Sequence, residues 1–255
     1  MDLEKSVPFK LFVSDGMAIY IGQRVQTKLH THHAIEIAIA FDKPFLISRN
    51  GTEFKESVCT FINADLAHQF NGQDDHHIFI YFDAESAVAQ LLETSLNLDV
   101  FGILDYTGIS INGVKNLFID WFYDDSANDK AASNLIQLLL ESILGTSQRH
   151  NILEPRIADA IELVRSALYS EIRLEAIAAK VFLSEGRFAH LFKEQIGIPF
   201  RRYVLWCRLQ AALKAIVQGR TLTQAAYEGG FADISHFSRT FTEMFGASPS
   251  VVLKQ

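Results

Sequence analysis

Three histidines and one glutamate in the first part of the chain have types and a spacing that suit a shared binding site. His30, His32 and Glu36 form the pattern H-x-H-x3-E, and His68 follows after several apolar segments. Imidazoles and a carboxylate that converge inside a β-structure can hold a divalent metal, bind an organic ligand or order the interior. We favour a ligand site and assign no metal, cofactor or catalytic residue. A metal-dependent enzyme or a metal sensor built on the same four residues is the alternative.

A second group of residues is repeated at an offset of 49 positions near the carboxyl terminus. The pairs are Phe182 with Phe231, Ser184 with Asp233, Phe188 with Phe237, Phe192 with Phe241, Glu194 with Glu243 and Gly197 with Gly246. The one pair that is not identical exchanges one helix-capping residue for another. The residues of each unit predict a short helix, a tight turn and a second helix that ends at a glycine, which is the helix-turn-helix arrangement.

The second helix of each unit combines an aromatic face with a polar or small face. In the later helix the outward residues are Ser235, Ser238, Arg239 and Thr242, opposite Phe237, Phe241, Met244 and Phe245. In the earlier helix they are Gly186, Arg187, Ala189, His190 and Lys193, opposite Phe188, Leu191 and Phe192. Arg can contact guanine, and Ser or Thr can contact either pair type, so these faces favour the major groove of double-stranded DNA.

The segment between the two units has a length that suits two neighbouring grooves. Residues from Pro199 to Gln218 would span about 30 Å as one helix. Successive major-groove faces of B-DNA lie about 34 Å apart. One chain can therefore present both second helices to one face of a promoter.

The stretch from about residue 155 to 250 resembles the DNA-binding domain of the AraC/XylS family of transcription regulators. LSEGRFAHLFKEQIG is similar to its first recognition helix, and GFADISHFSRTFTEMFGASP to its second-unit signature. The resemblance implies that bases are read by Gly186, Ala189 and His190 and by Ile234, Ser235 and Arg239. The full set of predicted DNA contacts adds Ser184, Arg187, Lys193, Ser238 and Thr242.

Several residues depart from the family pattern. Arg173 stands where a Ser or Thr cap is usual, Ile198 replaces a small polar residue, and Gly186 and Ala189 carry no polar side chain. We therefore expect the first unit to contribute mainly phosphate and thymine-methyl contacts. The second unit is expected to supply most of the polar base contacts.

The histidine pattern resembles the cupin-like sensing domain found in the same family. The resemblance implies a regulator, not an enzyme, with promoter DNA, a small-molecule effector and RNA polymerase as its partners. Activation and repression are both open. His33, His76 and His77 are expected at the surface or at strand edges.

Composition supports two domains of opposite charge. The chain has 255 residues and a formal net charge of −7. Residues 151–255 carry 13 basic and 10 acidic side chains, a balance of +3, which leaves −10 for residues 1–150. Only the carboxyl-terminal part can approach phosphates without net repulsion. No segment suits a membrane span or a secretory signal, so we expect a cytoplasmic protein.

The elements that must position these residues change type along the chain. Alternating apolar segments predict antiparallel strands over about 8–83, and helical spacing follows over about 84–146. We expect an α+β protein with a cupin-like sensing and dimerisation domain over 1–150, joined by a linker at 145–151 to an AraC-type DNA-binding domain of about seven helices over 151–255. An apolar stripe from Leu135 to Ile143 is either core or the seam of a homodimer. Cys59 and Cys207 are expected to be buried.

Overall fold

The chain is divided into two compact units. The computed structural model describes residues 9–14, 16–23, 25–106, 110–124, 129–144 and 153–253. One unit contains residues 1–150 together with 242–255, and the other contains residues 151–241. The expected linker at 145–151 lies outside the described residues. The domain limits given above stay a prediction.

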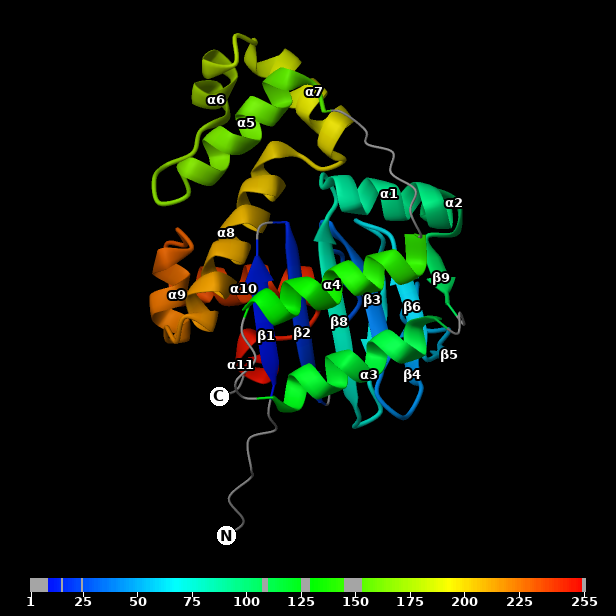
Figure 1. Cartoon of the computed structure of the whole chain (residues 1–255). Helices are drawn as coiled ribbons and strands as arrows, with labels where there is room; N and C mark the ends of the chain where they lie inside the picture. Colours follow the sequence, from blue (N-terminus) through cyan, green and yellow to red (C-terminus); the bar gives the residue numbers. More distant parts are fainter. Residues whose placement is uncertain are drawn as a thin grey trace. The chain divides into compact units, whose positions relative to one another are not determined.

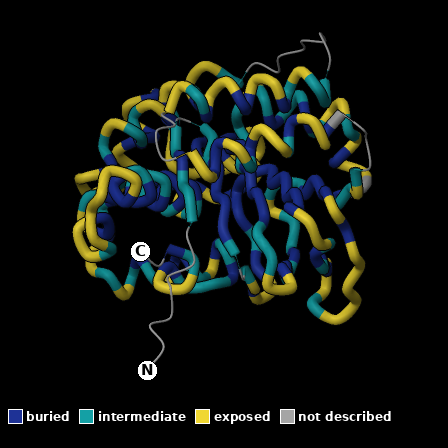
Figure 2. The backbone as a smooth tube through the Cα atoms, turned by 60° about the horizontal axis from the view of Figure 1, so that its bottom comes forward, coloured by how far each residue is buried: buried dark blue, intermediate teal, exposed yellow. Residues whose placement is uncertain are grey.

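The first unit is built on two antiparallel sheets. The six-stranded sheet has the order β1 (Lys10–Ser14), β2 (Met17–Gln23), β8 (His76–Asp83), β3 (Ala34–Ala40), β6 (Cys59–Ile62) and β9 (Ile103–Asp105). The three-stranded sheet has the order β5 (Lys55–Ser57), β4 (Phe45–Ser48) and β7 (Gln69–Asn71). The central strands β3, β6 and β8 are almost entirely buried, as the dark blue strands of Figure 2 show.

Four helices pack around the larger sheet, and two of them cover one of its faces. They are α1 (Ala87–Leu96), α2 (Leu98–Phe101), α3 (Ser110–Tyr123) and α4 (Asp129–Leu144), and Figure 1 shows α3 and α4 lying across the strands. Ile35, Ile37 and Ile39 of β3 belong to the same apolar core as side chains of α1, α3 and α4. Side chains alternate along a strand, so Glu36 points to the opposite face. The fold thereby aims one carboxylate away from the apolar core.

The apolar stripe of α4 belongs mainly to this core. Leu135, Ile136 and Leu139 are buried in the core, whereas the side chain of Leu138 is 43% exposed. Most of the stripe singled out in the sequence is therefore occupied within the protomer. A contact with a second copy would have to use the outer face of the helix.

Helices make up the second unit and the end of the chain. They are α5 (Pro155–Ser166), α6 (Leu174–Lys180), α7 (Glu185–Ile196), α8 (Phe200–Val217), α9 (Leu222–Glu228), α10 (Ile234–Phe245) and α11 (Pro249–Val252). Among the described residues, no helix combines the length and apolar character needed to cross a bilayer. The expected α+β class with a strand-rich first part and a helical second part is confirmed.

Three short strands were not expected from the sequence. β5, β7 and β9 have three residues each. Alternation over so few residues does not rise above chance, and hydrogen bonds to longer neighbours define these strands instead. The six longer strands agree with the alternating segments of the sequence. Cys59 and Cys207 are both buried, as expected.

Candidate functional site

Two helix-turn-helix units form the candidate DNA-reading surface. In the first, the Ser184 hydroxyl accepts a hydrogen bond from the Arg187 amide at 3.4 Å and opens α7. In the second, the Asp233 carboxylate accepts one from the His236 amide at 2.7 Å and opens α10. Gly197 and Gly246 follow the two helices with positive φ angles, as the repeat predicts.

The turns of the two units differ by one residue. The amide of Leu183 bonds to the carbonyl of Ala178, and the amide of Phe231 bonds to that of Ala226, so Leu183 and Phe231 are equivalent. The pairing of Phe182 with Phe231 is therefore wrong as a structural equivalence. Phe182 instead matches Gly230 at the left-handed position, with a side chain that is 90% exposed, whereas that of Phe231 is 3% exposed. The second turn holds one extra residue, Ala232. Equivalent residues are therefore 48 positions apart before this turn and 49 positions apart from the caps Ser184 and Asp233 onward.

The outward face of α7 has the composition expected from the sequence. Ser184, Gly186, Arg187, His190 and Lys193 are exposed, and Ala189 is half-buried. The His190 Nδ1 atom lies 3.7 Å from a Glu194 carboxylate oxygen one turn later on the exposed surface. Phe188, Leu191 and Phe192 are buried in the core that α7 shares with α5, α6 and α8. The helix is thus anchored by one face and free on the other.

The outward face of α10 is narrower than expected. Ser235 and Arg239 are exposed, but Ile234, Ser238 and Thr242 are only half-exposed, and the Thr240 side chain is buried. The apolar face is anchored by Phe237, Phe241 and Met244, which are all buried.

A groove in the second unit brings together residues from both helix-turn-helix units. Its volume is about 1070 Å³, and its lining includes Gly186 and Ala189 of α7, Arg201 of α8 and His236 of α10. The exposed Arg201 and the half-buried His236 were not among the predicted DNA contacts. Arg201 opens the helix that links the two units, and a basic residue at that position was the available signal.

The four residues of the predicted ligand site converge in the first unit. His30 and His68 form an isolated antiparallel bridge, with both amide-to-carbonyl distances at 3.0 Å. Their rings lie 4.2 Å apart, and the ring of His32 lies 4.9 Å from that of His68. All three imidazoles and the Glu36 carboxylate are buried. The structure therefore brings together every residue that the sequence assigned to this pocket.

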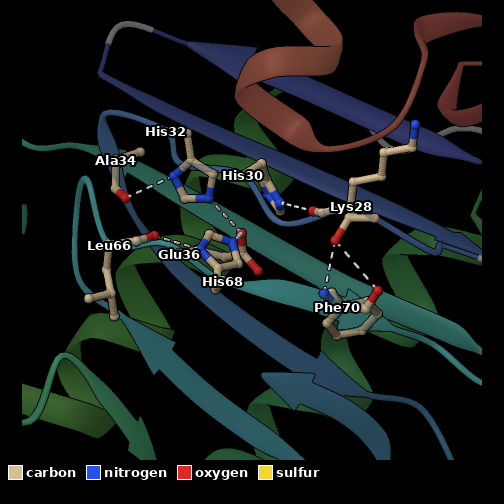
Figure 3. A network of polar contacts seen from close by, with 9 residues as sticks. Lys28, His30, His32, Ala34, Glu36, Leu66, His68 and Phe70 are labelled. Atoms are coloured by element: carbon tan, nitrogen blue, oxygen red, sulfur yellow. Dashed lines mark hydrogen bonds and ion pairs between the residues drawn. The ribbon is translucent and has the colours of Figure 1, made fainter. Parts of the chain in front are cut away.

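Each imidazole in the pocket is oriented by a backbone carbonyl (Figure 3). The Nδ1 atoms of His30, His32 and His68 lie 2.8, 3.1 and 2.9 Å from the carbonyl oxygens of Lys28, Ala34 and Leu66, respectively. The His32 Nε2 atom lies 2.8 Å from Glu36 Oε2, and the His68 Nε2 atom lies 3.5 Å from the same oxygen.

Burial sets the electrostatics of the pocket. Desolvation, with repulsion from the neighbouring imidazoles, lowers the pKa of His30 to about 3. Desolvation also lowers the pKa of His32, against its contact with Glu36. Burial and the nearby Glu36 carboxylate raise the pKa of Tyr81. The lowered pKa values of His30 and His32 therefore favour their neutral forms near neutral pH.

Two other histidines contradict the sequence-based expectation of surface positions. His33 is buried, with Nδ1 at 2.8 Å from an Asp65 carboxylate oxygen and Nε2 at 3.5 Å from one of Glu85. His77 is fully buried, and its ring lies against those of Phe45 and Phe70. A polar residue type alone did not reveal that the surrounding sheets would enclose both rings.

The last turn of α10 belongs to the same compact unit as the pocket. The Lys28 amide donates a hydrogen bond to the Gly246 carbonyl at 2.7 Å, and the rings of Phe245 and His32 are 6.1 Å apart. A Cβ atom added at Gly246 would lie 2.7 Å from His30 Nδ1. Only a glycine allows so close an approach between this segment and the histidine pocket.

The carboxyl-terminal sequence is similar to that of known transcription regulators. Residues 177–255 match a family model described as a helix-turn-helix domain. LumQ of Photobacterium leiognathi, named as a transcriptional regulator, is 26% identical over 74% of this chain and 76% of its own length. The transcriptional activator RhaR of Pectobacterium atrosepticum is 31% identical over 44% of this chain, and the arabinose operon regulatory protein of Escherichia coli K12 is 32% identical over 47%. This chain spans 42% of each of these last two relatives.

Solved structures extend the likeness to both parts of the fold. Apo ToxT from Vibrio cholerae aligns with a TM-score of 0.63 at 11% identity, over 94% of this chain and 98% of that protein. ToxT bound to an unsaturated fatty acid aligns with a TM-score of 0.59 at 14% identity, over 99% of this chain and 97% of that protein. At this level of identity the likeness concerns the fold. Together with the helix-turn-helix match over residues 177–255 and the named relatives, it supports a DNA-binding transcription regulator.

Proposed function

We propose that this regulator reads promoter DNA with unequal contributions from its two units. α10 supplies most of the polar base contacts, and α7 supplies mainly phosphate and thymine-methyl contacts. The observation that carries this proposal is the composition of the two exposed faces. Gly186 and Ala189 offer no polar side chain in α7, while α10 exposes Ser235 and Arg239. α8 has 18 residues and therefore a length of about 27 Å, which is close to one turn of B-DNA.

Sequence selection from random duplexes with the full chain tests this assignment. Arg239→Ala should lower discrimination between bases at one position of the selected operator, because Arg contacts guanine specifically. His190→Ala should change discrimination less. Lys193→Ala is the matched control for a phosphate contact, and should weaken binding to all duplexes and reduce its salt dependence. A larger loss of discrimination from His190→Ala than from Arg239→Ala would overturn the assignment.

We further propose that a small effector binds the pocket of His30, His32, Glu36 and His68 and changes the affinity of the protein for DNA. The pocket is buried and polar, and the last turn of α10 belongs to the same compact unit. Coupling between two binding sites is reciprocal in free energy. Operator must therefore change effector affinity by the same factor by which effector changes operator affinity. Titrations of each in the presence and absence of the other measure this factor, and an operator affinity that the effector leaves unchanged would contradict the proposed coupling.

A homodimer through the outer face of α4 is proposed as the acting form. Leu138 is the large apolar side chain that α4 leaves exposed among the described residues. Leu138→Glu should lower the mass seen by sedimentation to that of a monomer. Leu117→Glu is the matched control, since Leu117 of α3 is 42% exposed and lies outside the proposed contact. An unchanged mass in Leu138→Glu would remove α4 from the interface.

The remaining assignments follow from this role. We propose that the protein acts in the cytoplasm together with RNA polymerase and that the histidine pocket serves sensing, without catalysis. Its named relatives are regulators of transcription.

A further inference from the structure

The groove of the second unit is lined by two residues that oppose the helices carrying them. Gly186 is the second residue of α7, and Arg201 is the second residue of α8. Glycine favours a helix less than alanine does, and a cation in the first turn of a helix meets the positive end of the helix dipole. Residues that break local rules of stability are concentrated at functional sites. Both residues therefore direct attention to binding.

Gly186 is required neither by its backbone conformation nor by its neighbours. It is not among the glycines with positive φ angles. A Cβ atom added at this position would meet no atom of the described residues within 4 Å. The glycine therefore leaves open space in the lining of the groove, and such a position suits the close approach of another molecule's backbone.

The three arginines that line the groove differ in what they contact. Arg173 forms an ion pair with Glu171, whose carboxylate oxygen lies 2.8 Å from its Nε atom, and Arg208 donates a hydrogen bond to the Ser170 carbonyl at 3.3 Å. Arg201 is exposed and makes no side-chain hydrogen bond or ion pair with any residue that the structure describes. Of these three guanidinium groups, that of Arg201 is the one available to an anion.

Two carboxylates limit where an anion can lie in the groove. Glu175 and Glu185 also line it, in the first turns of α6 and α7, where the helix dipole favours acidic residues. Both side chains would repel a phosphate. We therefore expect a phosphate to lie against Arg201 and away from these two residues.

We propose that the groove holds the sugar-phosphate backbone of one DNA strand, with Arg201 as a phosphate contact and Gly186 as the point of closest approach. The inference rests on the proposed function, because it needs α7 and α10 in neighbouring major grooves. Between two such contacts on one face of B-DNA, the minor groove and its phosphates face the protein. Ala189 of α7 and His236 of α10 both line the groove, so its lining joins the two helices between which that backbone has to pass.

Salt dependence tests the role of Arg201. The affinity of the full chain for its selected operator is measured between about 50 and 200 mM salt. Arg201→Ala should lower the slope of log affinity against log salt concentration by about one, since one phosphate is no longer neutralised, and Arg201→Lys should retain the slope. Arg156→Ala is the matched control, because it removes an exposed arginine outside the groove and should leave the slope unchanged. An unchanged slope in Arg201→Ala would overturn the phosphate contact.

Uncharged phosphates locate this contact on the DNA. Methylphosphonates are placed one at a time along the operator, between the two major grooves that the protein contacts. The wild-type chain should lose roughly 5-fold or more in affinity at one of these positions, because a hydrogen bond to a charged group is lost there. Arg201→Ala should lose nothing further at that position. If this variant responds to every methylphosphonate as the wild type does, Arg201 does not contact the backbone and the inference fails.

Gly186→Leu tests the close approach. The new side chain enters open space in the free protein, and leucine favours a helix more than glycine does, so the Tm should not fall. Operator affinity should fall about 10-fold, because the side chain occupies the place of the DNA backbone. Gly113→Leu is the matched control, since a Cβ atom at this exposed glycine of α3 also meets no described atom within 4 Å. Wild-type affinity in Gly186→Leu would overturn the close approach.

Failure of the inference can be distinguished from failure of the proposed function. A wild-type chain that binds no duplex at all would remove the proposed function. A wild-type chain that binds its operator, with an affinity, salt slope and methylphosphonate response equal to those of Arg201→Ala, would overturn the inference alone.

Discussion

The two helix-turn-helix units follow one pattern, but their local stabilisation differs. α9 begins with a capping box in which Thr221 and Gln224 satisfy each other's backbone amides, whereas α6 begins at Arg173 with no side-chain cap. The left-handed position of the second turn is Gly230, whereas that of the first is Phe182. The cap of α10 is a carboxylate at 2.7 Å, and that of α7 is a hydroxyl at 3.4 Å.

This difference shows that two units of the same architecture can rely on different sources of stability. The second unit satisfies its helix ends and turn with the residues that those positions favour. The first unit lacks two of these residues, at Arg173 and Phe182, and its Phe188 and Phe192 are buried to the same extent as Phe237 and Phe241 of the second unit. Removing a favoured turn or cap residue should therefore destabilise the second unit more than the first, and introducing one should stabilise the first unit.

Gly230→Ala is expected to have the largest effect. The residue has φ +77°, and an added Cβ atom would overlap the carbonyl oxygen of Leu168. Strain and overlap together should lower the free energy of unfolding of the second unit by roughly 2–4 kcal/mol. Denaturant unfolding followed by Trp206 fluorescence measures this, in a Trp121→Phe background that removes the tryptophan of the first unit.

Gly219→Ala is the matched control for this change. Gly219 has φ +83°, but an added Cβ atom meets nothing within 4 Å. Only the left-handed strain applies there, at a cost of about 1 kcal/mol. Equal losses in the two variants would show that the overlap with Leu168 does not matter and would weaken the contrast between the turns.

The caps of α7 and α10 are expected to give the next largest difference in stability between the two units. Asp233→Ala removes a short, charged hydrogen bond and should cost about 1.5 kcal/mol, whereas Ser184→Ala removes a long one and should cost about 0.5 kcal/mol. Asp233→Asn keeps an acceptor and should recover most of the loss. The same fluorescence measurement ranks the three variants. A larger loss of stability in Ser184→Ala than in Asp233→Ala would show that the cap of α7 is the stronger one.

Much of the fold could be predicted from residue periodicity. The alternating segments around Ile19, Ile37 and Ile80 became strands, because a strand with one face in an apolar core has this pattern. The difference between the turns could not be predicted, since Phe182 and Phe231 match in type at the offset of the repeat. Backbone hydrogen bonds decide that Leu183, which is half-buried, is the equivalent of the buried Phe231.

The candidate sites were predicted with similar limits. His30, His32, Glu36 and His68 converge, because their spacing suits adjacent strands. The tautomer of each ring depends on which carbonyl it meets, which no sequence spacing encodes. The burial of His33 and His77 depends likewise on tertiary packing. Ser238 was predicted to be outward from helical period alone, but the structure leaves it half-exposed.

Phe182→Gly should stabilise the first unit. The aromatic side chain is 90% exposed and gains little from packing, while its φ of +59° is strained for a residue with a Cβ atom. Relief of this strain, less the greater freedom of glycine in the unfolded chain, should raise the free energy of unfolding by about 0.5–1 kcal/mol. Phe182→Ala is the control, since it removes the ring and keeps the strain. A gain in both variants would assign the effect to the exposed ring.

Arg173→Ser is expected to have the smallest effect. It should give α6 of the first unit a side-chain cap like the one that α9 has in the second unit. Arg173 opens α6 in an extended conformation that suits a capping side chain, but it makes no capping hydrogen bond. Its ion pair with Glu171 is exposed, and such pairs contribute little. A serine hydroxyl at this position should accept a hydrogen bond from the first turn and raise the Tm by a few degrees. Arg173→Ala separates the new cap from the loss of the arginine. If the serine and alanine variants melt at the same temperature, the missing cap is not a weakness of α6, and the contrast between the units rests on their turns alone.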